Sequence, residues 1–131
     1  MKTIEVVAAI IQKDGKILAT QRGYGDMAGG WEFPGGKVEP DEALEDALVR
    51  EIREELDALI EVERHVATIN YSYETLHLTM HCYLASLAEG EAITLIEHSS
   101  ARWVDATTAD SVDWLPADIL VVNELKRQGI L

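Results

Sequence analysis

Cysteine is almost absent from the sequence, and basic residues, proline and phenylalanine are scarce. Cys82 is the sole cysteine, which excludes an internal disulfide, so no oxidising compartment is implied and a cytoplasmic location is expected. Lys and Arg number 11 against 24 Asp and Glu, a net charge of −13. This balance argues against a nucleic-acid polymer as partner, because such binding depends on neutralising phosphates.

Long hydrophobic runs are also missing. The run Val6 to Ile11 is too short for a membrane-spanning helix, and it lacks the basic start and cleavage site of a signal peptide. No membrane partner is therefore expected. A chain of 131 residues leaves no room for a second core, so residues 1–131 are expected to form a single domain, acting as a monomer or a homodimer.

Several segments have the alternation and β-branched content of strands. Asp14-Gly15 is a strong hairpin signal between the first two, and Glu74-Thr75 separates the two longest, which are expected to pair antiparallel. The expected strands are Ile4–Gln12, Lys16–Gln21, Ile60–Tyr73, Leu76–Leu87 and Ala101–Val104.

Two helices are expected. Asp41–Asp57 contains no Gly or Pro, and Asp41 is placed to cap its first turn. Pro116–Gln128 begins with a proline suited to a first turn and has amphipathic spacing at Leu120, Val121 and Leu125. Because strands and helices do not alternate regularly, the fold class is α+β, a mixed or mostly antiparallel sheet covered by helices.

Carboxylates on the first helix fall beside its buried face. A solvated face is the ordinary explanation of an acidic run. With Leu44 at zero and about 100° per residue, however, the apolar stripe ends at Leu56 near about 120°, and Glu55 falls near about 20°. Glu51 falls near about 340° and Glu54 near about 280°. Partly buried carboxylates this close repel one another unless a cation neutralises them, which predicts a Mg²⁺ or Mn²⁺ site.

The loop before this helix contains the adjacent glycines Gly35 and Gly36. Such a pair is compatible with a simple turn, but it also allows the backbone to approach a ligand or metal closely. Its place beside the carboxylates favours the second interpretation. The four histidines lack the spacing of a zinc site and receive no role.

These residues together resemble the signature of the Nudix hydrolases. Gly36, five residues, Glu42 and seven residues lead to Arg50-Glu51-Ile52-Arg53-Glu54-Glu55. The departure is Asp57, where the family has a glycine that ends the helix in a left-handed conformation, which Asp tolerates. The flanks are similar to the MutT-like branch, whose members include CTP pyrophosphohydrolases and 8-oxo-dGTP diphosphatases.

The resemblance implies an α/β/α sandwich and a set of site residues. Glu51, Glu54, Glu55, Glu97 and the carbonyl of Gly35 match metal ligands, although Glu97 also reads as a solvated loop acid. Arg50 matches an arginine that orients the glutamates and is expected to pair with Glu42. The expected substrate-binding residues are Arg22, Phe33, Lys37, Tyr73 and Asp118.

The expected reaction is hydrolysis of a nucleoside triphosphate to the monophosphate and pyrophosphate with Mg²⁺, or Mn²⁺ as substitute. Glu51 is the first candidate for the general base and Glu97 the second. An ionised Asp118 would accept hydrogen bonds from the amine of cytosine or the N–H groups of guanine, or it could simply cap the last helix.

The substrate is left between cytidine-type and oxidised or modified (d)NTPs such as 8-oxo-dGTP, which would give the chain a role in nucleotide-pool sanitation and DNA repair. Two alternatives stay open. One is a Nudix hydrolase of ADP-ribose, a nucleotide sugar or a dinucleoside polyphosphate. The other is a non-catalytic nucleotide-binding regulatory module.

Overall fold

The computed structural model describes residues 1–131, and its elements follow the expected order with three additions, two short strands and a short 3-10 helix. The strands are β1 (Lys2–Lys13), β2 (Lys16–Arg22), β3 (Trp31–Glu32), β4 (Gly35–Lys37), β5 (Ile60–Ser72), β6 (Leu76–Leu87) and β7 (His98–Val104). The helices are α1 (Leu44–Leu56), α2 (Pro116–Arg127) and a short 3-10 helix (Ala109–Ser111).

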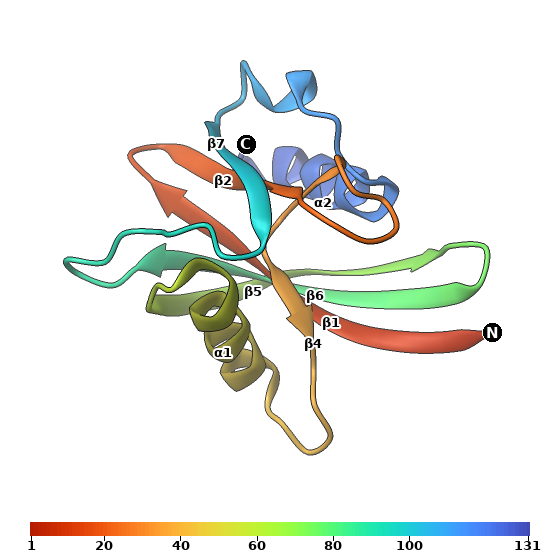
Figure 1. Cartoon of the computed structure of the whole chain (residues 1–131). Helices are drawn as coiled ribbons and strands as arrows, with labels where there is room; N and C mark the ends of the chain where they lie inside the picture. Colours follow the sequence, from red (N-terminus) through yellow and green to blue (C-terminus); the bar gives the residue numbers. More distant parts are fainter.

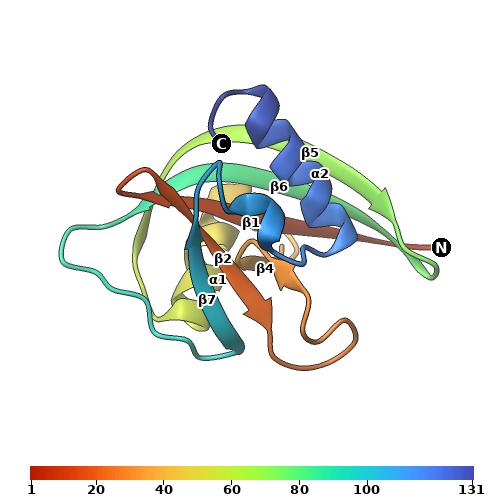
Figure 2. The same cartoon turned by 90° about the horizontal axis from the view of Figure 1, so that it is seen from above.

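β1 is the central strand of a mixed sheet. It pairs with β6 in parallel along most of its length, and β6 pairs with β5 in the long antiparallel ladder expected from the sequence. On its other side β1 pairs with β4, and with β2 only next to the hairpin turn. Beyond that turn β2 diverges and pairs with β3 and β7. Because of this divergence the backbones of β2 and β4 lie apart (Figures 1 and 2).

The two long helices cover opposite faces of the sheet (Figure 1). Alternate β1 residues divide between two buried clusters, Ala8 and Ile10 with the residues of α2, and Val7, Ala9 and Ile11 with those of α1. A strand buried on both faces reads as a continuous apolar run, which explains residues 6–11. Figure 2 shows α2 lying over β5 and β6. The expected α/β/α sandwich with a mixed sheet is confirmed.

The first helix is shorter than expected at its start. It begins at Leu44, and Asp41 does not cap it, because Asp41 lies in a turn with φ +62° and Ala43 precedes the helix without a side-chain cap. The hydrogen bond from the N–H of Glu39 to the carboxylate of Glu42 belongs to the same turn. The C-terminal end of α1 agrees with the expectation, because Asp57 takes the left-handed conformation with φ 48° and ψ 42°.

Three further local expectations need correction. Gly35–Lys37 is not loop but a short strand, and β7 begins at His98 rather than Ala101, in both cases because a neighbouring strand supplies the hydrogen bonds. On α2, Leu120 is exposed, and the buried side includes Ala117, Val121 and Leu125. The spacing of four residues along this buried side follows the helix period.

Candidate functional site

Three glutamates in the second half of α1 differ in exposure as their helical positions predict. The side chain of Glu55 is 8% exposed, that of Glu51 15% and that of Glu54 56%. Glu55 thus lies among the buried residues of the helix, and Glu54 reaches solvent. Glu51 and Glu55 are thus shielded from solvent as expected, whereas Glu54 is exposed and not partly buried.

Glu55 lies in an environment that disfavours its ionised form. Burial, and then the neighbouring charges of Glu51, Glu32 and Glu97, raise the pKa of Glu55 to about 9, while a backbone hydrogen bond from Gly35 lowers it in part. Burial also raises the pKa of Glu51, against hydrogen bonds from Arg50 that lower it. Without an added cation the environment therefore favours the neutral form of Glu55, and a bound cation would favour its ionised form.

Strand β4 turns backbone polar groups toward this helix. Ala9 donates its N–H to Pro34 and Val38 donates to Glu5. Since hydrogen-bonded pairs alternate along an antiparallel ladder, the N–H and C=O groups of Gly35 and Lys37 point away from β1. Accordingly, the carbonyl of Lys37 accepts a hydrogen bond from Arg50 at 3.0 Å. The carbonyl of Gly35 faces the same edge.

The absence of a side chain on Gly36 makes room for Glu51. A Cβ on Gly36 would lie 2.2 Å from Oε2 of Glu51, and one on Gly35 would lie 1.9 Å from the carbonyl oxygen of Val7. The paired glycines therefore have separate roles. Gly35 lets β4 lie against β1, and Gly36 lets the helix carboxylate lie against β4.

Arg50 connects the turn before α1 to the glutamates of the helix. Its Nε and Nη2 donate to the two carboxylate oxygens of Glu42 at 2.8 and 2.9 Å, which confirms the expected pair. Its Nη1 donates to Glu51 at 2.9 Å and to Glu54 at 3.3 Å. Hydrogen bonds from Arg50 are the main cause that lowers the pKa of Glu42 to about 2.

Glu97 is brought to the cluster by backbone hydrogen bonds at the end of α1. The last carbonyls of a helix lack partners within it. Here the carbonyl of Glu55 accepts the N–H of Ile96 at 3.1 Å, and that of Leu56 accepts the N–H of Thr94 at 2.8 Å. Glu97 follows directly and faces the charges of Glu51 and Glu55.

Two pockets adjoin at β4. The first, called here the acidic pocket, has a volume of about 490 Å³ and is bordered by Glu51, Glu55, Glu97 and His98, with Tyr24 from the loop after β2. Of the expected metal-site residues, only Glu54 lies outside its lining. The structure therefore brings Glu97 together with Gly35 and the carboxylates Glu51 and Glu55, although Glu97 is remote in sequence.

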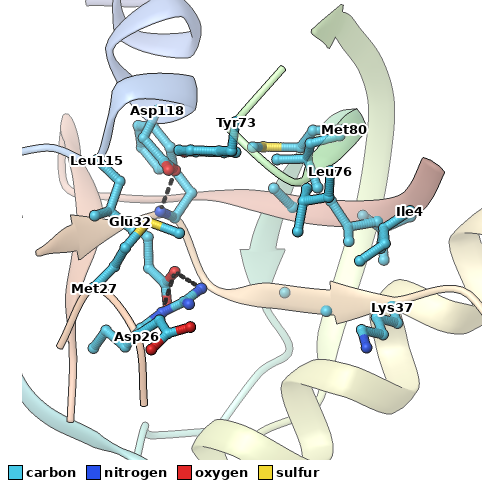
Figure 3. Close-up of a pocket in the computed structure, with 18 residues that line it drawn as sticks. Ile4, Asp26, Met27, Glu32, Lys37, Tyr73, Leu76, Met80, Leu115 and Asp118 are labelled. Carbon is cyan, nitrogen blue, oxygen red and sulfur yellow. Dashed lines mark hydrogen bonds and ion pairs between the residues drawn. The ribbon is translucent and has the colours of Figure 1, made fainter. Parts of the chain in front are cut away.

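The second, called here the apolar pocket, has a volume of about 380 Å³ and a mostly hydrophobic lining. In Figure 3, Asp118 and Tyr73 lie along one side and Leu76, Met80 and Ile4 along another, while Glu32 lies below Asp118 and Lys37 lies far from it. Phe33 also lines it and is buried against Trp114, with ring centroids 4.6 Å apart. The expected substrate-binding residues Phe33, Tyr73, Lys37, Arg22 and Asp118 all line this pocket.

Asp118 is a buried acid in the first turn of α2, yet it does not cap the helix. Its Oδ1 accepts the backbone N–H of Phe33 at 3.0 Å, and the N–H of Ala117 instead donates to the hydroxyl of Tyr73 at 3.3 Å. Burial raises the pKa of Asp118 to about 8. In the free protein at neutral pH the surroundings therefore favour the protonated carboxyl, in contrast to the ionised Asp118 expected from the sequence.

Five residues border both pockets and form what we call the shared wall: Arg22, Glu32, Gly35, Gly36 and Lys37. Arg22 donates to Oε1 of Glu32 from Nε at 3.2 Å and from Nη2 at 2.7 Å. Burial raises the pKa of Glu32, but hydrogen bonds from His98 and Arg22 outweigh it and lower the pKa overall. The shared wall thus contains an ionised carboxylate held between two donors.

The family model described as the NUDIX domain matches residues 1–123. The chain belongs to the Nudix family.

Similarity to individual Nudix proteins extends along nearly the whole chain. It is 44% identical to the CTP pyrophosphohydrolase of Escherichia coli (strain K12), over 91% of this chain and 88% of the relative. It is 30% identical to the 8-oxo-dGTP diphosphatase of the same strain, over 97% and 99%. The solution structure of the E. coli ORF135 protein superposes with a TM-score of 0.83 at 39% identity, covering 98% of this chain and 92% of that one.

The expectation of a Nudix hydrolase that acts on phosphoric anhydride bonds is confirmed at this level. Members of the family generally use divalent metal ions. No helix of the structure combines the length and the apolar character needed to cross a membrane.

The donor set of the acidic pocket fits such an ion. Its side chains do not form a closed cage of three or more ligands. Hard divalent cations such as Mg²⁺ need none, because they combine a few carboxylates with waters and substrate phosphates. A buried carboxylate whose pKa is raised to about 9 and a backbone edge at Gly35 are the observations that fit a cation here.

Two residues of the site were missed from the sequence. Glu32 and His98 lie within 3.2 Å of each other, although 66 positions separate them. Glu32 had a weak signal, because it lies three positions before the two adjacent glycines. His98 had none beyond its position next to Glu97, since a single histidine at the edge of a strand has no diagnostic spacing.

Proposed function

We propose that residues 1–131 form a single-domain Nudix hydrolase that converts a free nucleoside triphosphate to the monophosphate and pyrophosphate, with Mg²⁺ or with Mn²⁺ as substitute. The observation that carries this proposal is the pair of adjoining pockets with a shared wall. One is apolar and suited to a flat base, the other is acidic and open to cations and phosphates. A nucleoside triphosphate is a ligand with these two ends.

The acidic pocket is the proposed metal and phosphate site. Glu51, Glu54, Glu55, Glu97 and the carbonyl of Gly35 would hold the cation, which supplies Lewis acidity to activate water and offsets charge that develops on the phosphoryl oxygens. Arg22 and Lys37 stand at the shared wall, where they would pair with phosphate oxygens. Arg50 orients Glu51 through the hydrogen bond at 2.9 Å.

Glu51 is our first candidate for the base that takes a proton from water. Burial raises its pKa, which brings the carboxylate closer to the range in which a general base is effective. Glu97 is the second candidate. It borders the same pocket, so either carboxylate could lie near an attacking water.

The apolar pocket is the proposed base site, and its chemistry favours cytosine. A protonated Asp118 has one O–H to donate and oxygen lone pairs to accept. Cytosine offers the complementary ring nitrogen and exocyclic amine, whereas two adjacent N–H groups of guanine would require the ionised carboxylate. The similarity to a CTP pyrophosphohydrolase at 44% identity supports the same preference, and that to an 8-oxo-dGTP diphosphatase supports an oxidised purine as second candidate.

The test is pyrophosphate release with Mg²⁺ from CTP, dCTP, 5-methyl-dCTP, dGTP and 8-oxo-dGTP, with ADP-ribose as outgroup. We expect cytosine nucleotides to have the highest kcat/KM. Preference for 8-oxo-dGTP would replace the cytosine assignment with nucleotide-pool sanitation. Cleavage of ADP-ribose alone would contradict the substrate class, and no turnover of any nucleotide would contradict catalysis.

A further inference from the structure

His98 lies between two carboxylates that come from different parts of the fold. Its Nε2 is 3.2 Å from Oε2 of Glu32 on β3 and 3.5 Å from Oε2 of Glu55 on α1. The side chain of His98 is 4% exposed. Its other ring nitrogen, Nδ1, is buried without a hydrogen-bond partner. All polar contacts of this buried side chain are therefore made by Nε2, and both are to carboxyl groups on other elements of the fold.

The sheet explains how His98 reaches this place. β2 lies between β3 and β7, and its Thr20 pairs with Glu32 in register. On the β7 side, the register shifts after Gln21, so that Arg22 faces His98 and Ser99 falls between two pairs. Such a bulge re-aims the side chain next to it. The bulge therefore places the imidazole at the edge from which α1 presents Glu55.

The unpartnered nitrogen indicates which ring nitrogen carries the hydrogen. A buried N–H without an acceptor costs more than a ring nitrogen lone pair without a donor, since every N–H in a protein interior is normally bonded. With the hydrogen on Nε2, the donor faces the ionised carboxylate of Glu32 at 3.2 Å, with the carboxyl group of Glu55 at 3.5 Å, and Nδ1 has only a lone pair. The contacts thus select the Nε2–H tautomer.

We infer that His98 is a positioning residue whose Nε2–H holds the carboxylates of Glu32 and Glu55 next to each other. This inference rests on the proposed function, in which Glu55 is a metal ligand. Through Glu32, which also accepts two hydrogen bonds from Arg22, the bridge connects the proposed phosphate-binding side of the shared wall to the metal-binding carboxylate. Without His98, Glu55 would lose the one ion-pair contact of its side chain and could rotate.

The first experiment measures Mn²⁺ binding by titration calorimetry without nucleotide, in wild type, His98→Leu and His98→Gln. We expect His98→Leu to weaken Mn²⁺ binding by roughly 10–100-fold, as typical for partners of metal ligands, and to lower kcat with little change in KM. His98→Gln, which keeps an N–H donor, should recover most of both. The control is His77→Leu, because His77 bonds Ser72 and Asn70 on an exposed part of the sheet.

The second experiment needs no metal and no substrate. In the metal-free wild-type protein with ¹⁵N-labelled histidine, the nitrogen resonances of His98 should report hydrogen on Nε2. Glu32→Gln and Glu55→Gln should each shift the Nε2 resonance. This measurement does not depend on whether the His98→Leu variant folds.

The outcomes separate the inference from the proposed function. Unchanged Mn²⁺ affinity in His98→Leu, equal loss in the Leu and Gln variants, or hydrogen on Nδ1 would overturn the positioning role. A wild-type protein that binds no Mn²⁺ would contradict the metal site itself. In that case the resonance shifts in the two Gln variants still decide whether His98 joins Glu32 and Glu55.

Discussion

Asp118 accepts a hydrogen bond at 3.0 Å from the backbone N–H of Phe33, which lies 85 positions earlier in the chain. The bond joins the first turn of α2 to the segment between β3 and β4, and both residues line the apolar pocket. One carboxylate oxygen is thus committed to the protein backbone. The carboxyl group has a second oxygen that is left for a ligand.

Replacing Asp118 with Asn is expected to change the ranking among bases more than the rate on the best one. Asn can keep the bond to Phe33 through its own Oδ1, but then presents an N–H group in place of the second oxygen. The amide matches the protonated carboxyl in offering one donor beside one acceptor, but it cannot ionise, so it cannot accept from two adjacent N–H groups of guanine. The measurement is kcat/KM for CTP, dGTP and 8-oxo-dGTP in both proteins. An unaltered ranking would show that Asp118 binds the backbone N–H of Phe33 but does not select the base.

The same substitution is expected to change how stability depends on pH. Burial raises the pKa of Asp118 from 3.8 to about 8, so between these values the folded protein binds more protons than the unfolded one. The contribution of Asp118 to the free energy of unfolding is then greatest below its unfolded pKa of 3.8 and decreases as pH rises toward 8. Asp118→Asn should flatten this decrease. Urea unfolding of the metal-free proteins between pH 4 and pH 8 tests it, and parallel curves would contradict it.

Glu55 contributes a slope of the same sign, because its pKa is raised from 4.5 to about 9. Asp118→Asn should therefore remove part of the decrease and Glu55→Gln another part. The two single variants serve as controls for each other.

Glu54→Gln is expected to lower kcat by more than about 100-fold, beyond the effect usual for partners of metal ligands. The side chain of Glu54 is 56% exposed and contacts only Arg50, so an isosteric amide should leave the fold intact. Steady-state kinetics with Mg²⁺ measure the expected decrease of kcat, and a thermal melt tests whether the fold is intact. A normal rate would mean that the metal is held elsewhere.

Alanine at the two adjacent glycines should separate stability from activity. Gly35→Ala places a Cβ against the backbone of β1, which should cost about 2 kcal/mol and lower Tm by roughly 5–10 °C. Gly36→Ala meets only the mobile end of the Glu51 side chain, so it should displace that carboxylate and lower kcat with a smaller change in Tm. Melting curves and steady-state kinetics of the two variants test this. An equal decrease of Tm in both would contradict it.

Glu51→Gln and Glu97→Gln should differ in the step that they affect. If Glu51 is the base, its amide removes proton transfer, and kcat should decrease by about 10²–10⁴-fold. Glu97→Gln should act mainly through metal affinity and be relieved in part by a higher Mn²⁺ concentration. The reverse pattern would assign the base to Glu97.

Local patterns accounted for much of the fold. The hairpin at Asp14-Gly15 has positive φ at both residues, as the dipeptide predicts, and Asp57 ends α1 in the left-handed region. Where local signals misled, a distant strand or side chain was the cause. Gly35–Lys37 became a strand because β1 offers it hydrogen bonds.

The sequence by itself determined the acidic face of α1, since residues three and four apart share a helix face wherever the helix is placed. It also determined the α+β class and which glutamates of α1, Glu51, Glu54 and Glu55, lie on neighbouring positions of the helix surface. Only the tertiary structure decided which groups are buried together. Burial by distant elements raises the pKa of Asp118 and Glu55, and strand pairing brings His98 to Glu32. These properties depend on the three-dimensional surroundings of each charge, which spacing along the chain does not encode.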